Sequence, residues 1–407
     1  MSRRALFATS LALLASGLLH SSHVSGEQPW TQWRGPHGDG HSDAPALLRW
    51  NDENVTWKTA LPGLGQSSPV VWGDRIFLTG AENDGAKRIV FCVSRKNGKL
   101  LWQQTAWTGD AEKTHQMNRW ASATCATDGE RVVAFFGRGG LHCYSMDGTR
   151  LWSRELGDFE NVWGTAASPI IAGELVIQNC DAEDSGSCLV ALNKETGAEV
   201  WRTAREQLRG WSTPVVVANG DKQELVLNGE TGVFGYDLAS GAQLWFSKGD
   251  TGRGTPTVTP TGDGLLVVVN GRPGDMFAVQ ADGKEVWRTK RKGGRDLPSP
   301  IVLDGQVIVV SLRPGTATSY IASSGKETAR LRLDGSFSAS PIAVSGHAII
   351  PNEDGLVYVL KAGDQGVEVV SKNKITLRAE NEIFRACVTP LEDGLLLRSD
   401  QTLYLIQ

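Results

Sequence analysis

The stretch KETGAEVWR, residues 194–202, decides the fold because versions of it recur along the chain. Each version places a glycine four residues before a tryptophan, in a segment with the composition of a tight β-hairpin. The others are KNGKLLWQ at 96–103, MDGTRLWS at 146–153, ASGAQLWF at 239–246 and ADGKEVWR at 281–288. Tryptophans repeated in this way either bind a ligand or pack one structural unit against the next.

Aligned on these hairpins, the chain divides into eight repeats. Their bounds are 67–102, 121–152, 166–201, 211–245, 254–287, 298–330, 338–370 and 385–407. The third repeat contains four short apolar runs, SPIIA, ELVIQN, CLVALN and AEVWRT, separated by turn residues, and such runs are typical of strands. Four antiparallel strands in about 40 to 45 residues match one blade of a β-propeller.

The two ends of the repeat region predict how the ring closes. The last repeat stops at LYLIQ, its third strand, whereas NVTWKTALPG at 54–63 is a fourth strand with no repeat before it. We therefore expect strand 55–61 to complete the last blade, which leaves no open sheet edge. The expected fold is all-β, an eight-bladed propeller of four-stranded antiparallel blades over residues 54–407.

The first 26 residues differ in composition from the rest. Two arginines precede an apolar run over residues 5–19, and small residues at 24–26 suit a signal peptidase. We expect a signal peptide at 1–26 and an exported protein, periplasmic or secreted, without a lipoprotein anchor because no cysteine lies near the cleavage region. Export by the Sec or the twin-arginine route stays open.

Residues 27–53 contain Trp30, Trp33 and Trp50 among many turn formers, so we expect an N-terminal arm packed along the propeller. The run at 5–19 is shorter than the roughly 20 apolar residues that span a bilayer, and no second run follows, so no transmembrane segment is expected. A formal net charge of −4 gives no reason to expect a nucleic-acid partner.

The cysteines suggest one disulfide and no metal site. Cys180 and Cys188 bracket DAEDSGS, a predicted hairpin loop, so they are the candidate disulfide of an exported protein. Cys92 and Cys143 occupy a repeat position held elsewhere by Ala191, which predicts small buried thiols. No Cys-x-x-Cys motif or His/Cys cluster indicates a metal.

The repeat resembles the quinoprotein-type (PQQ-like) repeat family. The resemblance rests on ALNKETGAEVW at 191–201 and on the starts at 168–169 and 213–214, and it covers nearly the whole mature chain. One branch of the family holds quinone-dependent alcohol and glucose dehydrogenases, and another holds the non-catalytic group around the outer-membrane assembly factor BamB. The opening at 30–50, followed by SSPVVWGDRIFLTG at 67–80, is also similar to exported PQQ-like propellers of planctomycete-type bacteria.

The resemblance implies that the recurring tryptophans are docking contacts between blades. These are Trp57, Trp102, Trp152, Trp201, Trp245 and Trp287. Repeats six and seven have Arg330 and Val370 at this position, so packing is expected to differ there. The dehydrogenases of the family carry adjacent cysteines, calcium ligands and a catalytic aspartate. This chain has no adjacent cysteines and no motif that matches the other positions, so we assign no catalytic residue and expect no cofactor. PQQ with Ca²⁺ remains the alternative.

The loops before the first strand and after the second strand of each blade are expected on one face, at the mouth of an axial funnel. The loops before the first strands contain Trp120, Trp163, Trp211, Arg253, Arg295, Phe337 and Arg385. His115 and Asn118 precede Trp120 and are expected on the same side. The second group, from the loops after the second strands, comprises Asn179, Asp181, Asn228, Glu230, Asn270, Arg272, Arg313, Asn352 and Glu353. Aromatic rings with arginines suit an anionic planar ligand, a carbohydrate or a partner's loop. The other interpretation is that these residues form turns and solubilise loops.

The sequence thus predicts an exported, monomeric, non-enzymatic propeller that binds protein partners in the periplasm or cell envelope, in a BamB-like scaffold role. The alternative is a quinone-dependent, dehydrogenase-like propeller, or one that binds a sugar or an anion, using the Trp/Arg-lined funnel.

Overall fold

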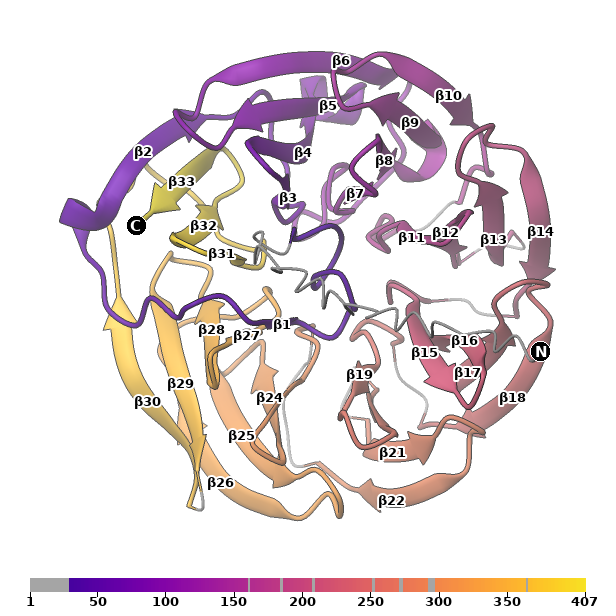
Figure 1. Cartoon of the computed structure of the whole chain (residues 1–407), viewed down its shortest axis with the longest axis vertical. Coiled ribbons are helices and arrows are strands. Elements are labelled where there is room, and N and C mark those ends of the chain that lie inside the picture. The colour runs from indigo at the N-terminus through magenta and orange to yellow at the C-terminus, as the bar shows by residue number, and fades with distance from the viewer. Residues whose placement is uncertain are drawn as a thin grey trace, which may run out of the picture.

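The computed structural model describes residues 29–159, 162–183, 186–206, 209–250, 253–270, 274–291, 297–363 and 365–407. The predicted signal peptide at 1–26 lies outside these residues. The described strands form eight sheets arranged in a ring, with the chain running once around it (Figure 1). The predicted eight-bladed β-propeller is therefore confirmed.

Each blade contains four antiparallel strands, counted from the axis outward. Blade 1 contains β3 (Val70–Trp72), β4 (Arg75–Glu82), β5 (Lys87–Ser94) and β6 (Leu100–Thr108). Blade 2 contains β7 (Ala126–Thr127), β8 (Arg131–Phe135), β9 (Leu141–Ser145) and β10 (Arg150–Arg154). Blade 3 contains β11 (Ile170–Ala172), β12 (Leu175–Cys180), β13 (Cys188–Asn193) and β14 (Glu199–Ala204). Blade 4 contains β15 (Val215–Asn219), β16 (Lys222–Asn228), β17 (Gly232–Asp237) and β18 (Gln243–Lys248).

The second half of the ring repeats this order. Blade 5 contains β19 (Thr259–Pro260), β20 (Leu265–Val269), β21 (Met276–Gln280) and β22 (Glu285–Thr289). Blade 6 contains β23 (Ile301–Leu303), β24 (Gln306–Ser311), β25 (Thr316–Ile321) and β26 (Glu327–Arg332). Blade 7 contains β27 (Ile342–Val344), β28 (His347–Pro351), β29 (Val357–Gly363) and β30 (Gly366–Asn373). Blade 8 contains β31 (Thr389–Leu391), β32 (Gly394–Arg398) and β33 (Thr402–Ile406), and its fourth strand is β2 (Val55–Ala60).

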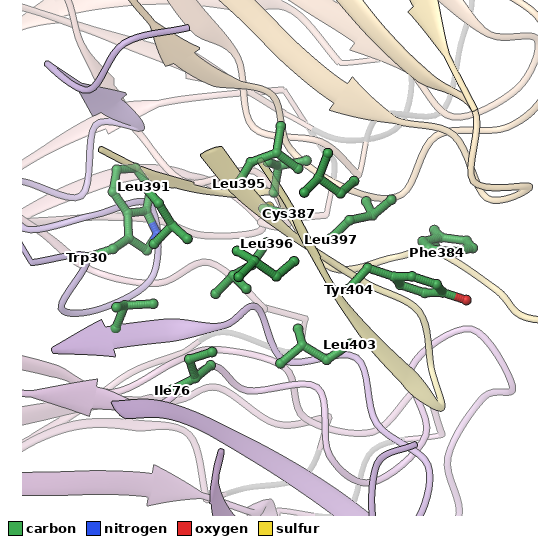
Figure 2. Packing of buried hydrophobic residues seen from close by; sticks show 14 of the residues in the cluster. Trp30, Ile76, Phe384, Cys387, Leu391, Leu395, Leu396, Leu397, Leu403 and Tyr404 are labelled. Atoms are coloured by element: carbon green, nitrogen blue, oxygen red, sulfur yellow. The ribbon is translucent and has the colours of Figure 1, made fainter. Parts of the chain in front are cut away.

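The two ends of the chain close the ring as predicted. Strand β2 pairs antiparallel with β33, one residue shorter than the expected span, and lies beside it in Figure 1. Figure 2 shows the apolar core at this junction, where Leu396 and Leu403 of blade 8 lie near Ile76 of blade 1 and Trp30 of the arm. Closure by strand pairing removes the exposed edge that an open sheet would present.

The N-terminal arm crosses the centre of the ring instead of running only along its surface (Figure 1). Trp30 O accepts a hydrogen bond from Val71 N in blade 1, and Arg34 Nη2 donates to Pro300 O beside blade 6 at 2.7 Å. A two-residue strand, β1 (His41–Ser42), then pairs in parallel with β27, so blade 7 has five strands instead of four. The arm thereby closes one end of the central channel.

A circle of side chains joins the blades around the channel. The eight positions are Ser68, Thr124, Ser168, Thr213, Thr257, Ser299, Ser340 and Cys387. At seven of the eight junctions, the backbone N–H of one position donates to the side-chain oxygen or sulfur of the next, at 2.9 to 3.3 Å. At the eighth position, Thr257 Oγ1 accepts a hydrogen bond from Trp33 Nε1 of the arm at 3.1 Å. The Ser-Pro and Thr-Pro starts thus have a structural role that their sequence pattern did not reveal.

His142 of β9 is buried and gives the fold a pH dependence. Its Nε2 donates to Gly139 O at 2.7 Å, and Nδ1 has no hydrogen-bond partner among the described residues. Burial lowers the pKa of His142 to about 4. An unfolded histidine titrates near pH 6.5, so as the pH falls the unfolded state binds the proton first and stability is lost between about pH 6.5 and about pH 4.

We therefore expect the urea midpoint of the wild type to fall between about pH 7.5 and about pH 4.5, and that of His142→Gln to fall less. Unfolding curves at several pH values would test this. If the urea midpoint falls equally with pH in the wild type and in His142→Gln, His142 is not the source of the pH dependence.

The described residues include three short 3₁₀ turns, Asp52–Asn54, Asn83–Gly85 and Gly137–Gly139. No helix in the described part of the chain is long and apolar enough to cross a bilayer.

Candidate functional site

A cavity lies on the propeller axis, and we call it the funnel. Its volume is about 210 Å³, and it opens to solvent. Its wall consists of loops that precede the first strands of the blades and of five members of the side-chain circle. Trp33 of the arm lines it from the end that the arm closes, so the funnel is blind.

One wall of the funnel is a stack of flat side chains. The ring centroids of His115 and Trp163 lie 4.4 Å apart. The guanidinium carbon of Arg253 lies 4.4 Å from the Trp163 ring centroid and 6.0 Å from that of Trp211. These separations are within the range of cation–π attraction. A delocalised cation thus lies within reach of two indole rings, and all three side chains line the cavity.

Hydrogen bonds within the loops position this stack. Asn118 Nδ2 donates to Trp163 O at 2.8 Å, and Trp211 Nε1 donates to Gly164 O at 2.7 Å. Gly164 has φ +76°, and a Cβ there would lie 2.1 Å from Thr114 Oγ1, so only glycine fits. The loops that carry the stack are therefore fixed by neighbouring backbone and have little freedom to rearrange.

Arg385 supplies the second guanidinium of the wall. Its Nε donates to Glu353 Oε1 at 2.9 Å, and its Nη1 donates to Gln116 O at 3.1 Å. Ser338, which also lines the funnel, donates to the same carboxylate oxygen. Glu353 therefore offsets much of the charge of Arg385, and the cation in the aromatic stack is Arg253.

Two polar atoms in the wall lack partners among the described residues. Gln66 Nε2 and Thr255 Oγ1 are buried atoms of residues that line the funnel, and neither has a hydrogen-bond partner in the described part of the chain. A buried polar atom without a partner costs about 1 to 3 kcal/mol. A ligand, a partner group or water can therefore form a hydrogen bond with this amide nitrogen and this hydroxyl.

The structure brings six of the nine predicted funnel residues to the cavity. They are His115, Asn118, Trp163, Trp211, Arg253 and Arg385. Trp120 instead covers Gly85 and donates from Nε1 to Glu112 O at 2.8 Å. Phe337 is fully buried against Tyr358 between blades 6 and 7, with ring centroids 5.7 Å apart. Arg295 lies outside the described residues. Trp120 and Phe337 were expected at the mouth because loop position alone does not tell which way a side chain turns.

The described members of the second predicted group do not line the funnel. Asn179 donates to Ser212 O, Asn228 to Pro256 O, and Asn270 to Asn228 Oδ1, so these buried amides join neighbouring blades. Asn352 Nδ2 donates to Asp334 O in the loop between blades 6 and 7. Asp181 forms a buried ion pair with Arg205 at 2.7 Å, Arg313 donates to Ser336 Oγ, Glu353 binds Arg385, and Glu230 lies outside the cavity. Arg272 is outside the described residues.

Most of the polar lining and the floor of the funnel were not predicted from the sequence. Trp33 was expected only as part of an arm packed along the propeller, and Ser168, Thr213 and Ser299 were recognised only at the starts of repeats. The signal that could have found them is their shared position. The first residues of eight radial strands must meet at the axis.

Calcium does not fit the described lining of the funnel. Ca²⁺ takes six to eight oxygen ligands, and proteins usually supply carboxylates among them. None of the described residues that line the funnel is an aspartate or glutamate, and the described chain holds no group of three His, Cys, Asp or Glu side chains that could bind a metal. The donors are hydroxyls, amides, one imidazole and two guanidiniums, a set that suits an anion better than a divalent cation.

The six predicted docking tryptophans lie against the hairpin glycines of the neighbouring blades. Trp152 is typical: its ring covers Gly197 of blade 3, where a Cβ would lie 2.6 Å from the indole, and its Nε1 donates to Lys194 O at 2.9 Å. Trp57, Trp102, Trp201 and Trp287 make the same kind of bond to Arg95, Met146, Leu238 and Ala322. Trp245 covers Gly283 of blade 5 but donates to Glu224 of its own blade.

A bulge in each blade turns the fourth strand so that this position faces the next blade. In blade 3 the register between β13 and β14 shifts between Glu199 and Trp201. Val200 is the extra residue of this bulge and is exposed at the rim. Blades 6 and 7 lack the tryptophan and pack in another way. The strand register places Ala329 and Ser371 at its position, so the predicted Arg330 and Val370 were each wrong by one residue. A Cβ on Gly366 would lie 2.3 Å from that of Ala329, so a glycine and an alanine let strands β30 and β26 approach directly.

All six cysteines are free thiols, and all are buried. Cys92 and Cys143 face Trp102 and Trp152 across their strand pairs, where a larger residue would displace the indole. Cys180 and Cys188 face one another at the end of the β12–β13 pairing.

Comparison with known proteins places the chain among propellers of this type. The family model described as "Outer membrane protein assembly factor BamB" matches residues 40–177, 86–273, 229–313 and 272–369. No curated protein sequence matches the chain. Among solved structures, BamB from Moraxella catarrhalis is 18% identical, with a TM-score of 0.62, over 86% of this chain and 98% of that one.

Structures of enzymes share the fold as well. A europium-containing methanol dehydrogenase is 11% identical, with a TM-score of 0.73, over 93% of this chain and 98% of that one. Quinohemoprotein alcohol dehydrogenase from Comamonas testosteroni is 11% identical, with a TM-score of 0.68, over 93% of this chain and 80% of that one. At such low identity these likenesses show the fold alone. Since the family model spans most of the chain, the protein belongs to the PQQ-like propeller family of the outer membrane protein assembly factor BamB.

Proposed function

We propose that this protein is an exported, non-enzymatic scaffold of the cell envelope that binds a protein partner through the funnel. A loop or chain end of the partner enters the mouth and packs against the Trp163–Arg253–Trp211 stack. The protein acts as a monomer. The name of its family, an outer membrane protein assembly factor, supports a role in binding other proteins.

The observation that carries this proposal is the aromatic and cationic wall of a blind cavity. Aromatic residues and arginine are the residue types most enriched at binding hot spots. The stack is held by backbone hydrogen bonds, so little conformational entropy is lost when a partner binds. The described lining offers neither carboxylates for a calcium ion nor an arrangement of nucleophile and base.

Site-specific cross-linking in the native host tests the proposal. With a photoreactive residue at Met117, which lines the funnel, we expect one protein to be captured reproducibly. A photoreactive residue at Phe246, exposed on the outer rim, is the matched control and should not capture it. Trp163→Ala and Arg253→Gln should each reduce the captured product by about tenfold or more, the scale of a lost hot spot.

The control for folding is the melting temperature of each variant, which should stay close to that of the wild type for Arg253→Gln. If Met117 and Phe246 capture the same proteins, or if capture is unaffected by both substitutions, the funnel is not the binding surface.

A small ligand is the second candidate, because of the unpartnered Gln66 Nε2 and Thr255 Oγ1. The chemistry of the wall favours an anionic planar molecule or an acidic sugar over a calcium-bound quinone. Ligands that bind only the folded state raise its melting temperature. A panel of acidic glycans, and of pyrroloquinoline quinone with and without Ca²⁺, should therefore stabilise the wild type and not Trp163→Ala if this function is the correct one.

A further inference from the structure

Cys180 and Cys188 meet at the last residue pair of the β12–β13 ladder. They are directly opposite in register and both are buried, at 1% and 4% exposure. Directly opposed residues of antiparallel strands have Cα atoms about 4.5 to 5.5 Å apart, within the roughly 4.4 to 6.8 Å that a disulfide spans. The backbone can therefore accept a bridge without moving far.

An arginine distinguishes the two sulfur atoms. Arg202 Nη1 lies 3.0 Å from Cys188 Sγ, and Arg202 itself is held by Glu199 and by Leu156 O. The hydrogen bond from Cys180, followed by the charge of Arg202, lowers the pKa of Cys188, while burial raises the pKa of Cys180. A cation beside a sulfur stabilises the thiolate, which is the reactive form of cysteine.

The other cysteines have no cysteine opposite them in a strand pair, and the arginines near them do not outweigh the effect of burial on the thiol pKa. Cys92 and Cys143 face indole rings across their strand pairs, not sulfur. Burial raises the pKa of Cys92, Cys125 and Cys143 to about 12 and also raises that of Cys387. These four thiols are therefore internal controls for any reaction of the pair.

We propose that Cys180 and Cys188 are a redox-active dithiol that closes to a cross-strand disulfide by exchange with an external disulfide. The Cys188 thiolate attacks the external disulfide, forms a mixed disulfide and releases the first external thiol. The sulfur of Cys180 then attacks Cys188 Sγ and displaces the second. The protein pair loses two electrons and two protons, and the external disulfide becomes two thiols. Neither sulfur lines the funnel, so this chemistry does not depend on what the funnel binds.

The bridge would close the hairpin loop 181–187 beside the junction of blades 3 and 4. Asp181, the residue after Cys180, forms the buried ion pair with Arg205, which also donates to Tyr236 of blade 4. Oxidation would thus tighten a hairpin that joins two blades. In an exported protein the oxidised form is the expected resting state.

The test begins with the full-length protein, whose thiols are blocked with N-ethylmaleimide as the cells are opened. Peptide mass spectrometry should find Cys180 bridged to Cys188 and the other four cysteines alkylated after unfolding. Reduction followed by oxidised glutathione should restore this bridge alone. If both sulfurs stay free, or if other cysteines react as readily, the proposal is overturned.

Two cysteine variants assign the order of attack. Cys180→Ser should accumulate glutathione on Cys188, because the resolving thiol is missing. Cys188→Ser should leave Cys180 unmodified. Equal modification of both variants would overturn the assignment of Cys188 as the attacking sulfur.

Arg288 is a matched control for Arg202, the cation beside Cys188. Each follows a docking tryptophan and pairs with a glutamate three residues earlier, but Arg288 lies over Phe277 and not beside a sulfur. Arg202→Gln in the Cys180→Ser background should slow glutathione addition about threefold for each unit by which the pKa of Cys188 rises. Arg288→Gln should leave the rate unchanged. Equal rates for the two variants would show that Arg202 does not activate the thiol.

Discussion

Replacing Trp152 with alanine is expected to lower the free energy of unfolding by about 3 to 5 kcal/mol, the range for large-to-small changes in a core. Trp152 is 6% exposed, fills the space between blades 2 and 3, and donates from Nε1 to Lys194 O. Its removal leaves a cavity between two sheets, because Gly197 offers no side chain to fill it. Urea unfolding followed by circular dichroism measures the loss.

Arg330→Ala is a surface control on the fourth strand of blade 6, where Ala329 holds the position equivalent to Trp152 and Arg330 is the next residue. Arg330 is partly exposed and pairs with Glu327 at the surface, so its removal should cost at most about 1 kcal/mol. A similar loss in the two variants would mean that docking by the tryptophan contributes little to the stability of the ring.

The second large effect is expected for Arg398→Met, at the closure of the ring. Arg398 of β32 is fully buried, and it donates to Ser67 O at 2.6 Å and to Thr79 O at 2.8 Å, both in blade 1. Methionine keeps much of the volume but leaves two buried carbonyl groups without a donor. At about 1 to 3 kcal/mol for each unpaired group, we expect a loss of about 3 kcal/mol or more in urea unfolding.

Arg95→Met tests whether this loss is specific to the buried contact. Arg95 also crosses from blade 1 to blade 8, where it pairs with Asp393, but that carboxylate is half exposed. Its substitution should cost about 1 kcal/mol or less. If the two variants lose equal stability, the buried guanidinium is not what holds the closure.

The folding pattern was predictable because each blade repeats the same local signals. Apolar runs of strand length between turn formers, a hairpin glycine and a tryptophan at a constant distance recur in the repeats up to Trp287. The isolated fourth strand at 55–60 predicted its pairing with the last repeat, because an unpaired strand and an incomplete sheet occur in the same chain. Such inferences need only spacing along the sequence.

The course of the arm was not predictable in this way. Residues 30–42 contact the first strands of several blades through backbone atoms, as Trp30 does with Val71 and Gly40 with Ala343. A contact between backbone groups leaves no pattern of side chains. The parallel strand β1 and the placement of Trp33 in the funnel were therefore missed.

The sequence by itself determined the number of blades, the strand order and, in the six blades with a docking tryptophan, the position that faces the neighbouring blade, because these follow from the period of the repeat. Only the tertiary structure decided which loop residues meet. It brought Trp163, Arg253 and Trp211 together, buried Phe337 in the core and packed the partly buried Trp120 against Gly85. It likewise showed that the arm makes the funnel blind. The physical reason is that blade geometry is set by local spacing, whereas the direction of a loop side chain depends on packing against residues from other blades, which the order of amino acids along the chain does not display.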